Sequence, residues 1–301
     1  MTRLPQIGWL ADGRRLHLQD GPIDLIVEAR GSEASLRTAH DAAARRFTGL
    51  LDELCGELPL LRQAADPQRC GLQGNVARRM HAAVAPFAAD HFITPMAAVA
   101  GAVAEEILGA MVHAARLDRA DVNNGGDIAL YLAHGAHFTV GLVDRPDRPG
   151  PMATTVIAAG DPSRGIATSG RHGRSFSLGI ADAVTVLART AAQADAAATI
   201  IANAVDLPGH PGIVRCRADD IQPDSDLGAR LVTRDVDGLK PFEIASALEA
   251  GADQARALLA AGLIDGAALC LQGERCIVAP GKFGIHAPVV SRREIESAIY
   301  A

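Results

Sequence analysis

The chain begins with polar and apolar residues that alternate with a period of two, and a helical period follows. Residues 15–19 and 22–29 flank Asp20–Gly21, a dipeptide suited to a tight turn, which predicts a β-hairpin. A helical pattern then starts at Ser35 or a neighbour and runs to about Gln63. Two further helices are predicted, near residues 75–89 and over residues 95–117, the second with Thr94 as its N-cap.

From Asp121 to about residue 188 the pattern changes to short segments rich in Val, Ile and Thr, separated by Gly, Pro and Asp. A helix at residues 190–205, a loop-rich interval and a helix at residues 242–262 follow. A last hairpin is predicted to turn at Gln272–Gly273. Because helices and strands come in blocks, we expect an α+β fold with a largely antiparallel sheet, in one domain over residues 1–301.

Composition narrows the function classes. With 301 residues and 49% hydrophobic side chains, the chain can bury a sizeable core, and its formal charge of -6 argues against nucleic acid as a partner. The five cysteines show no C-x-x-C pattern, which favours reduced thiols. Residues 93–111 form the longest apolar stretch, which Glu105 and Glu106 interrupt, and no signal peptide is seen. We therefore expect a cytoplasmic protein without a membrane partner.

The first candidate site lies on the helix that Thr190 begins, where Gln193 completes a capping-box pattern. Asp195, Thr199 and Asn203 recur at four-residue spacing on a helix that is otherwise apolar. A buried carboxylate and a hydroxyl one turn apart offer two hard oxygen ligands, which suits Mg²⁺. The alternative is that Asp195 is exposed and complements the helix dipole.

Residues 165–184 form the second candidate, because glycines, hydroxyls and two arginines gather there. Thr168, Ser169 and Gly170, with His172 just beyond, could offer backbone N–H groups and cations to a phosphate. An ordinary exposed loop is the alternative reading of this stretch.

The third candidate is the polar stretch at residues 123–127, set between apolar residues that read as strand. Gly125 and Gly126 allow positive φ or a close backbone approach to a ligand, while Asn123, Asn124 and Asp127 can bind a ribose, a ring edge or local backbone. A β-bulge or an Asx-turn would explain the same residues.

Taken together and in order, these stretches resemble the ApbE family. "VNNGGDIAL" resembles its V-N-x-G-G-[DN]-I element, "GIATSG" its A-T-S-G element and "ADAAATIIANAV" its A-D-x-x-A-T-A helix. The likeness covers about residues 14–279, and three motifs in the right order are far more specific than one.

The resemblance implies a T-fold-like α+β domain with affinity for FAD. ApbE enzymes are Mg²⁺-dependent FAD:protein FMN transferases, which split the pyrophosphate and join FMN to a threonine of a flavoprotein acceptor. It implies that Asp195 and Thr199 lie at the metal, with the loops at residues 123–127 and 168–170 beside the flavin nucleotide.

The chain also departs from the family pattern. Ala100 stands where the family transferases carry a lysine, and "FSLGIADAV" replaces the segment that holds their histidine base. His172 lies several residues earlier and is the available substitute. The chain is therefore similar to a cytosolic side branch of the superfamily. Three hypotheses stay open: a transferase acting on a flavoprotein or small molecule, a non-catalytic flavin or nucleotide binder or assembly factor, and an enzyme with an unrelated small-molecule substrate.

Overall fold

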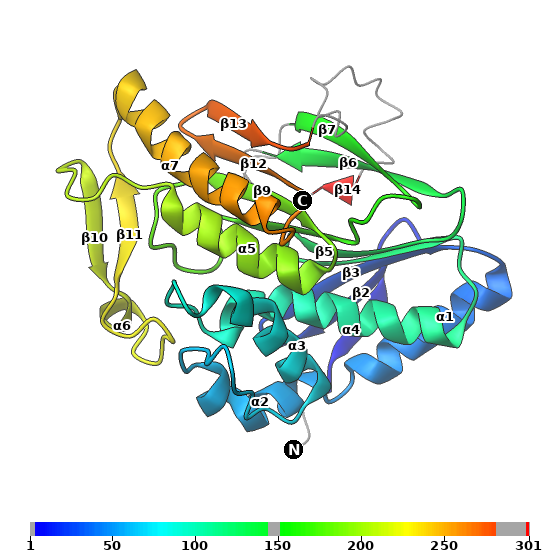
Figure 1. The fold of residues 1–301 in the computed structure, drawn as a ribbon. Coiled ribbons are helices and arrows are strands. Elements are labelled where there is room, and N and C mark those ends of the chain that lie inside the picture. Colours follow the sequence, from blue (N-terminus) through cyan, green and yellow to red (C-terminus); the bar gives the residue numbers. More distant parts are fainter. Residues whose placement is uncertain (1–3, 144–150, 281–298, 301) are drawn as a thin grey trace.

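A nine-stranded sheet forms the centre of the protein (Figure 1). The computed structural model describes residues 4–143, 151–280 and 299–300. Every strand pairing in this sheet is antiparallel, which confirms the predicted α+β class. In spatial order its strands are β1 (Gln6–Trp9), β2 (Leu16–Asp20), β3 (Ile23–Arg30), β4 (Arg119–Asn124), β5 (Asp127–Leu132), β8 (Gly165–Ser169), β9 (Ala183–Ala188), β12 (Gly266–Leu271) and β13 (Glu274–Val278).

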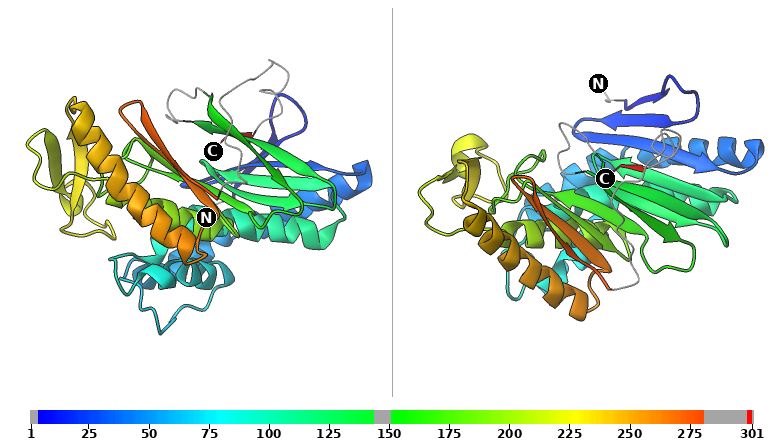
Figure 2. Two further views of the ribbon diagram at one scale, coloured as in Figure 1. Left: turned by 45° about the horizontal axis from the view of Figure 1, so that its top comes forward. Right: turned by 90° about the horizontal axis from the view of Figure 1, so that it is seen from above.

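Helices cover one face of this sheet, and a small sheet packs on part of the other (Figures 1 and 2). The helices are α1 (Glu33–Phe47), α2 (Leu50–Leu61), α3 (Asn75–Val84), α4 (Val99–Ala114), α5 (Ala191–Ala204), α6 (Ala218–Ile221) and α7 (Pro241–Ala260), with 3-10 turns η1 (Ala85–Phe87) and η2 (Pro95–Ala98). The small sheet has the order β14 (Ile299–Tyr300), β6 (His137–Val143) and β7 (Pro151–Ala158). A third sheet pairs β10 (Ile213–Arg217) with β11 (Leu231–Val236).

Alternation along the strands separates two hydrophobic cores. On β3, Leu25 and Val27 face the helices and belong to the main core. On β5, Ile128 and Leu130 point the other way and join Phe138 of β6 in the second core. The period-two pattern in the sequence therefore places β5 between the two cores.

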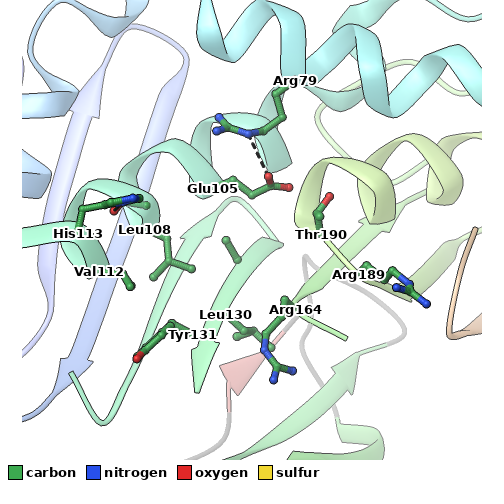
Figure 3. A pocket seen from close by; sticks show the side chains of 12 residues that line it. Arg79, Glu105, Leu108, Val112, His113, Leu130, Tyr131, Arg164, Arg189 and Thr190 are labelled. Atoms are coloured by element: carbon green, nitrogen blue, oxygen red, sulfur yellow. Dashed lines mark hydrogen bonds and ion pairs between the residues drawn. The ribbon is translucent and has the colours of Figure 1, made fainter. Parts of the chain in front are cut away.

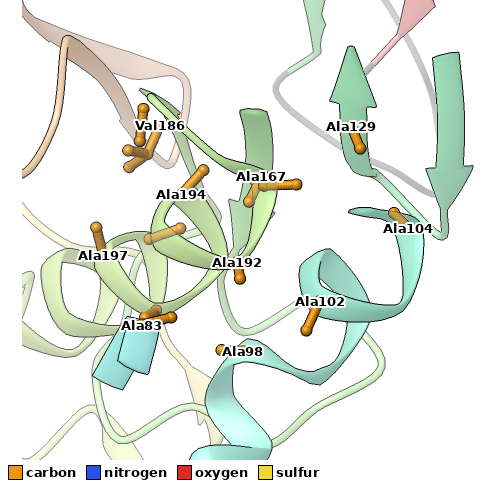
Figure 4. Close-up of a cluster of buried hydrophobic side chains, with 14 of the residues drawn as sticks. Ala83, Ala98, Ala102, Ala104, Ala129, Ala167, Val186, Ala192, Ala194 and Ala197 are labelled. Atoms are coloured by element: carbon orange, nitrogen blue, oxygen red, sulfur yellow. The ribbon is translucent and has the colours of Figure 1, made fainter. Parts of the chain in front are cut away.

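Small residues bring α4 and α5 unusually close. Alanines dominate the facing surfaces, with Ala102 and Ala192 fully or almost fully buried between them (Figure 4). A Cβ atom added to Gly101 would lie 2.3 Å from the carbonyl oxygen of Ala191. The backbones of the two helices thus touch at Gly101, where no larger residue fits.

The structure corrects the prediction of one helix over residues 35–63. Ser32 caps α1 by accepting a hydrogen bond from the backbone N–H of Ser35, so the helix begins earlier than Ser35. Gly49 then takes a φ of 84° and separates α1 from α2. Strand β1 and the β10–β11 hairpin were not predicted, because neither shows a buried period-two face: all four β1 residues are exposed.

One helical segment, Pro95–Ala114, is long and apolar enough to cross a membrane by length and composition alone. Half of its most apolar window is buried inside the protein, as expected of a core helix. The segment is therefore weak evidence for a membrane span, and its contacts with α1, α5 and β5 explain its apolar composition.

We expect Gly101→Ala to lower the free energy of unfolding by about 1–3 kcal/mol, because the new methyl group meets the fixed backbone of α5. Gly109→Ala in the same helix is the matched control, since a Cβ there meets no atom within 4 Å. The control should stabilise the protein by up to about 1 kcal/mol through helix propensity. Urea denaturation measures both changes, and equal effects would contradict the close α4–α5 contact.

Candidate functional site

Two carboxylates meet where β5, β8 and α5 converge. Asp127 is the first residue of β5, and its Oδ1 accepts a hydrogen bond from the backbone N–H of Thr168 in β8 at 3.2 Å. Asp195 comes from the second turn of α5, and its Oδ2 accepts from the backbone N–H of Gly101 at 3.1 Å. The three stretches singled out in the sequence are thereby brought together at one place.

The surroundings of this acid pair oppose its charge. Burial raises the pKa of Asp195 to about 7, although hydrogen bonds from the backbone of Gly101 and Ala100 act against the rise. Burial, and then the negative charge of Asp195, raise the pKa of Asp127 well above its usual range. The hydrogen bond from the backbone of Thr168 and then the charge of Arg174, which is itself exposed, oppose that rise. Two neighbouring acids whose pKa values are both raised favour a cation or a shared proton between them.

Asp195 also has a structural role, because it caps the first turn of α4. Glu105 of α4 does the same for α5, its Oε1 accepting from the backbone N–H of Ala192 at 2.7 Å. Each helix therefore supplies an acid to the N-terminal N–H groups of the other, which places both carboxylates in a favourable field. This capping excludes the alternative in which Asp195 is an exposed residue at its own helix end.

The stretch at residues 123–127 forms a two-residue hairpin turn between β4 and β5. Gly125 and Gly126 have φ values of 67° and 111°, as a tight turn with positive φ at both positions requires. The Oδ1 atom of Asn123 accepts from the N–H of Gly126 at 2.8 Å, and Nδ2 of Asn124 donates to the carbonyl oxygen of Ala100 at 3.2 Å. The tight turn by itself therefore explains why glycines stand at both positions. The hydrogen bond of Asn124 links this turn to the start of α4.

The loop after β8 lies against this turn and is held by a buried acid. A Cβ added to Gly125 would lie 1.9 Å from a guanidinium nitrogen of Arg174, so this loop covers the turn closely. Asp182 accepts from Arg171 at 2.8 Å and contacts Nε2 of His172 at 3.1 Å. Within the described ranges, no hydrogen bond or ion pair joins His172 to the acid pair.

The rest of the predicted site residues take different places. Thr168 shares a hydroxyl hydrogen bond of 2.8 Å with Thr185 across β8 and β9. Ser169 ends β8 half-buried, and Gly170 packs so tightly that a Cβ would lie 2.5 Å from the carbonyl oxygen of Asp182. Thr199 lies half-buried one turn beyond Asp195 on α5. Asn203, at the far end of the stripe, accepts from the N–H of Leu178 at 3.0 Å.

Among the described residues, no group of three or more His, Cys, Asp or Glu side chains could hold a metal ion. A metal at Asp127 and Asp195 would therefore need hydroxyl, carbonyl or water oxygens to complete its ligands. That requirement suits a hard cation rather than zinc.

A model of the protein family described as AbpE bacteria matches residues 7–277, nearly the whole chain. The chain belongs to this family. The match runs from β1 through β13, so it includes the acid pair and every loop around it.

The AbpE-family chain also resembles archaeal proteins. UPF0280 protein MK0206 of Methanopyrus kandleri is 35% identical over 183 residues, which cover 60% of this chain and 69% of the relative. A UPF0280 protein of Methanothrix thermoacetophila is 41% identical over 113 residues, and one of Methanothermobacter thermautotrophicus is 38% identical over 135 residues. These two matches cover 46% and 51% of the relatives' lengths.

Three further residues support the candidate site. Asp182 holds His172, Arg174 covers the glycine turn, and Gly101 gives Asp195 its hydrogen-bond donor. Arg174 is one of the two arginines that the sequence already offers as cations for a phosphate. Asp182 and Gly101 act through distant partners, which sequence spacing does not reveal.

We predict different effects for two substitutions of Asp195. Because its pKa is raised from 3.8 to about 7, the folded state holds the proton more tightly, and stability falls as pH rises between these values. Asp195→Asn keeps an oxygen for the N–H of Gly101 but removes the charge, so its stability relative to wild type should rise from pH 5 to pH 8. Asp195→Ala should lose about 1 kcal/mol even at pH 5, because the cap is gone.

Urea denaturation with a chelator present measures both variants without metal binding. The outcome that contradicts the prediction is a free energy of unfolding that differs between the Asp195→Asn variant and wild type by the same amount at pH 5 and at pH 8. That result would show that Asp195 titrates normally.

Proposed function

We propose that this protein is a Mg²⁺-dependent enzyme that uses FAD and transfers FMN, or a related nucleotidyl group, to a flavoprotein or small-molecule acceptor. The observation that carries the proposal is the meeting of Asp127 and Asp195 in surroundings that raise the pKa of both. The ApbE-related family supports the same chemistry. The transferase activity, the metal and the flavin are all part of the proposal.

The donor set fits Mg²⁺. Asp195 accepts from the backbone of Gly101 and Ala100 and keeps further carboxylate lone pairs for a metal, and Asp127 likewise uses Oδ1 for Thr168. Thr199 offers a hydroxyl one helical turn from Asp195. Two carboxylates and a hydroxyl are the hard oxygen ligands that Mg²⁺ takes, with waters and phosphate oxygens in the remaining positions. Bound there, the cation would neutralise the acid pair and the pyrophosphate.

The nucleotide would lie along the turn at residues 123–127 and the loop that begins at Thr168–Gly170. Gly125 is exposed, Thr168 and Ser169 are half-buried, and Arg174 adds a positive charge over Gly125. Backbone N–H groups and a guanidinium stabilise the charge that develops when a pyrophosphate is split.

In the proposed reaction, an acceptor hydroxyl oxygen forms a bond to the phosphorus of the FMN half of FAD. The bond from that phosphorus to the bridging oxygen breaks, and AMP leaves with the electron pair. His172 takes the hydroxyl proton, and Asp182 orients its ring through Nε2. Atoms balance as acceptor–OH plus FAD giving acceptor–O–FMN plus AMP.

A non-catalytic flavin or nucleotide binder, acting as an assembly factor, is the second candidate. Ala100 in place of the family lysine favours it, because one cation of the family transferases is missing. A scaffold with an unrelated small-molecule substrate is the third. All five cysteines are free thiols. Because free thiols are typical of a reducing compartment, we place the protein in the cytoplasm in each case.

The test is to incubate the purified protein with FAD, with and without Mg²⁺, and to measure FAD binding and AMP release. We expect Mg²⁺-dependent AMP release that falls at least about a hundredfold in Asp195→Asn. Asp253→Asn, which changes an exposed acid on α7, is the matched control and should keep the wild-type rate.

Binding of FAD without AMP release, in the presence of Mg²⁺ and of candidate hydroxyl acceptors, would favour the non-catalytic binder. No binding of FAD would rule out both flavin proposals and leave the unrelated substrate.

A further inference from the structure

A cavity lies between α4, β5 and the start of α5, away from the acid pair (Figure 3). Its volume is about 260 Å³. Apolar atoms of α4 and β5 make most of its wall. The lining residues are Arg79, Glu105, Leu108, Gly109, Val112, His113, Ala129, Leu130, Tyr131, Arg164, Arg189 and Thr190.

This cavity is lined by three arginines but by only one carboxylate. Arg79 reaches down from α3 and pairs with Glu105 at 3.1 Å (Figure 3). Glu105 is thereby neutralised, and its other oxygen already accepts from Ala192. Arg164 lies across the cavity from Arg79, and Arg189 lies at its edge beside Thr190 (Figure 3). Since Arg79 is paired with both Glu105 and Glu106, the positive charge at the cavity comes from Arg164 and Arg189.

Arg164 and Arg189 have no acidic partner in the part of the chain that the structure describes. Arg164 donates to the carbonyl oxygens of Asp161, Ser163 and Ala159 at 2.8, 2.6 and 2.7 Å, which fixes the guanidinium without neutralising it. Arg189 is exposed, and it forms no ion pair with a described residue. Guanidinium groups beside an apolar wall are typical of carboxylate and phosphate recognition.

We infer that this cavity binds a small organic anion, with its carboxylate or phosphate group at Arg164 and Arg189 and its apolar body against Leu108 and Val112. The inference goes beyond the proposed function, because the site is positive where the acid pair is negative. The N-terminus of α5 contributes little, since Thr190 and Glu105 already cap it. The small volume favours a compact molecule over a dinucleotide.

Gly109 offers a way to fill the cavity without disturbing the fold. It lines the cavity on α4, and an added Cβ meets no atom within 4 Å. Gly109→Leu should therefore place its side chain in the cavity while raising helix propensity. Gly56→Leu on α2 is the matched control, because a Cβ there also meets no atom within 4 Å and lies outside the cavity.

Isothermal titration calorimetry with phenyl phosphate, benzoate and inorganic phosphate tests the inference. We expect saturable binding of phenyl phosphate or benzoate to wild type, weakened at least about tenfold in Arg189→Gln and in Gly109→Leu and unchanged in Gly56→Leu. Asp195→Asn should bind the same probe like wild type, so failure of the flavin proposal leaves this result intact.

Three results would overturn the inference. They are no saturable binding of either organic probe, binding that survives both cavity variants, and binding of inorganic phosphate as tight as that of phenyl phosphate. The last result would mean that the apolar wall contributes nothing.

Discussion

The contact between α4 and α5 at Gly101 is the constraint on which the rest of the protein depends. Without a side chain at this position, the carbonyl oxygen of Ala191 comes close enough for each helix to offer an acid to the other. Two buried helix ends, which would otherwise leave N–H groups unsatisfied, are paired at once. The same contact fixes Asp195 opposite Asp127, so the candidate site is a direct product of how the core packs.

This packing divides the helical face into two regions of opposite charge. On one side, the capped start of α4 lies beside two acids whose ionisation is suppressed by burial. On the other side, the start of α5 lies beside three arginines around a cavity. Glu105 and Asp195 lie between these regions. Each caps the neighbouring helix, and Glu105 also pairs with Arg79. The proposed cation and the proposed organic anion would therefore use different residues.

Local signals could be read from the sequence, and long-range ones could not. Asp20–Gly21 gives a hairpin and Thr190 gives a helix start, because each acts within four residues. The break at Gly49 was missed, since apolar spacing continues through it. Asp195 was identified by its spacing to Thr199, whereas its hydrogen bond to Gly101 joins residues 94 positions apart. Three motifs in order suggested one site, but only the fold shows that Asp127 and Asp195 share it.

Asp182 has a consequence for how the protein is made. Besides Arg171 and His172, it accepts a hydrogen bond of 2.5 Å from the backbone N–H of Gln272, in the turn of the last hairpin. Strand β12 of that hairpin also pairs with β9, directly after Asp182. The loop that carries His172 thus gains its anchor from a segment 90 residues further along the chain. During synthesis on the ribosome, the early strands and α4 can form first, while this loop acquires its final position only after the closing hairpin has emerged.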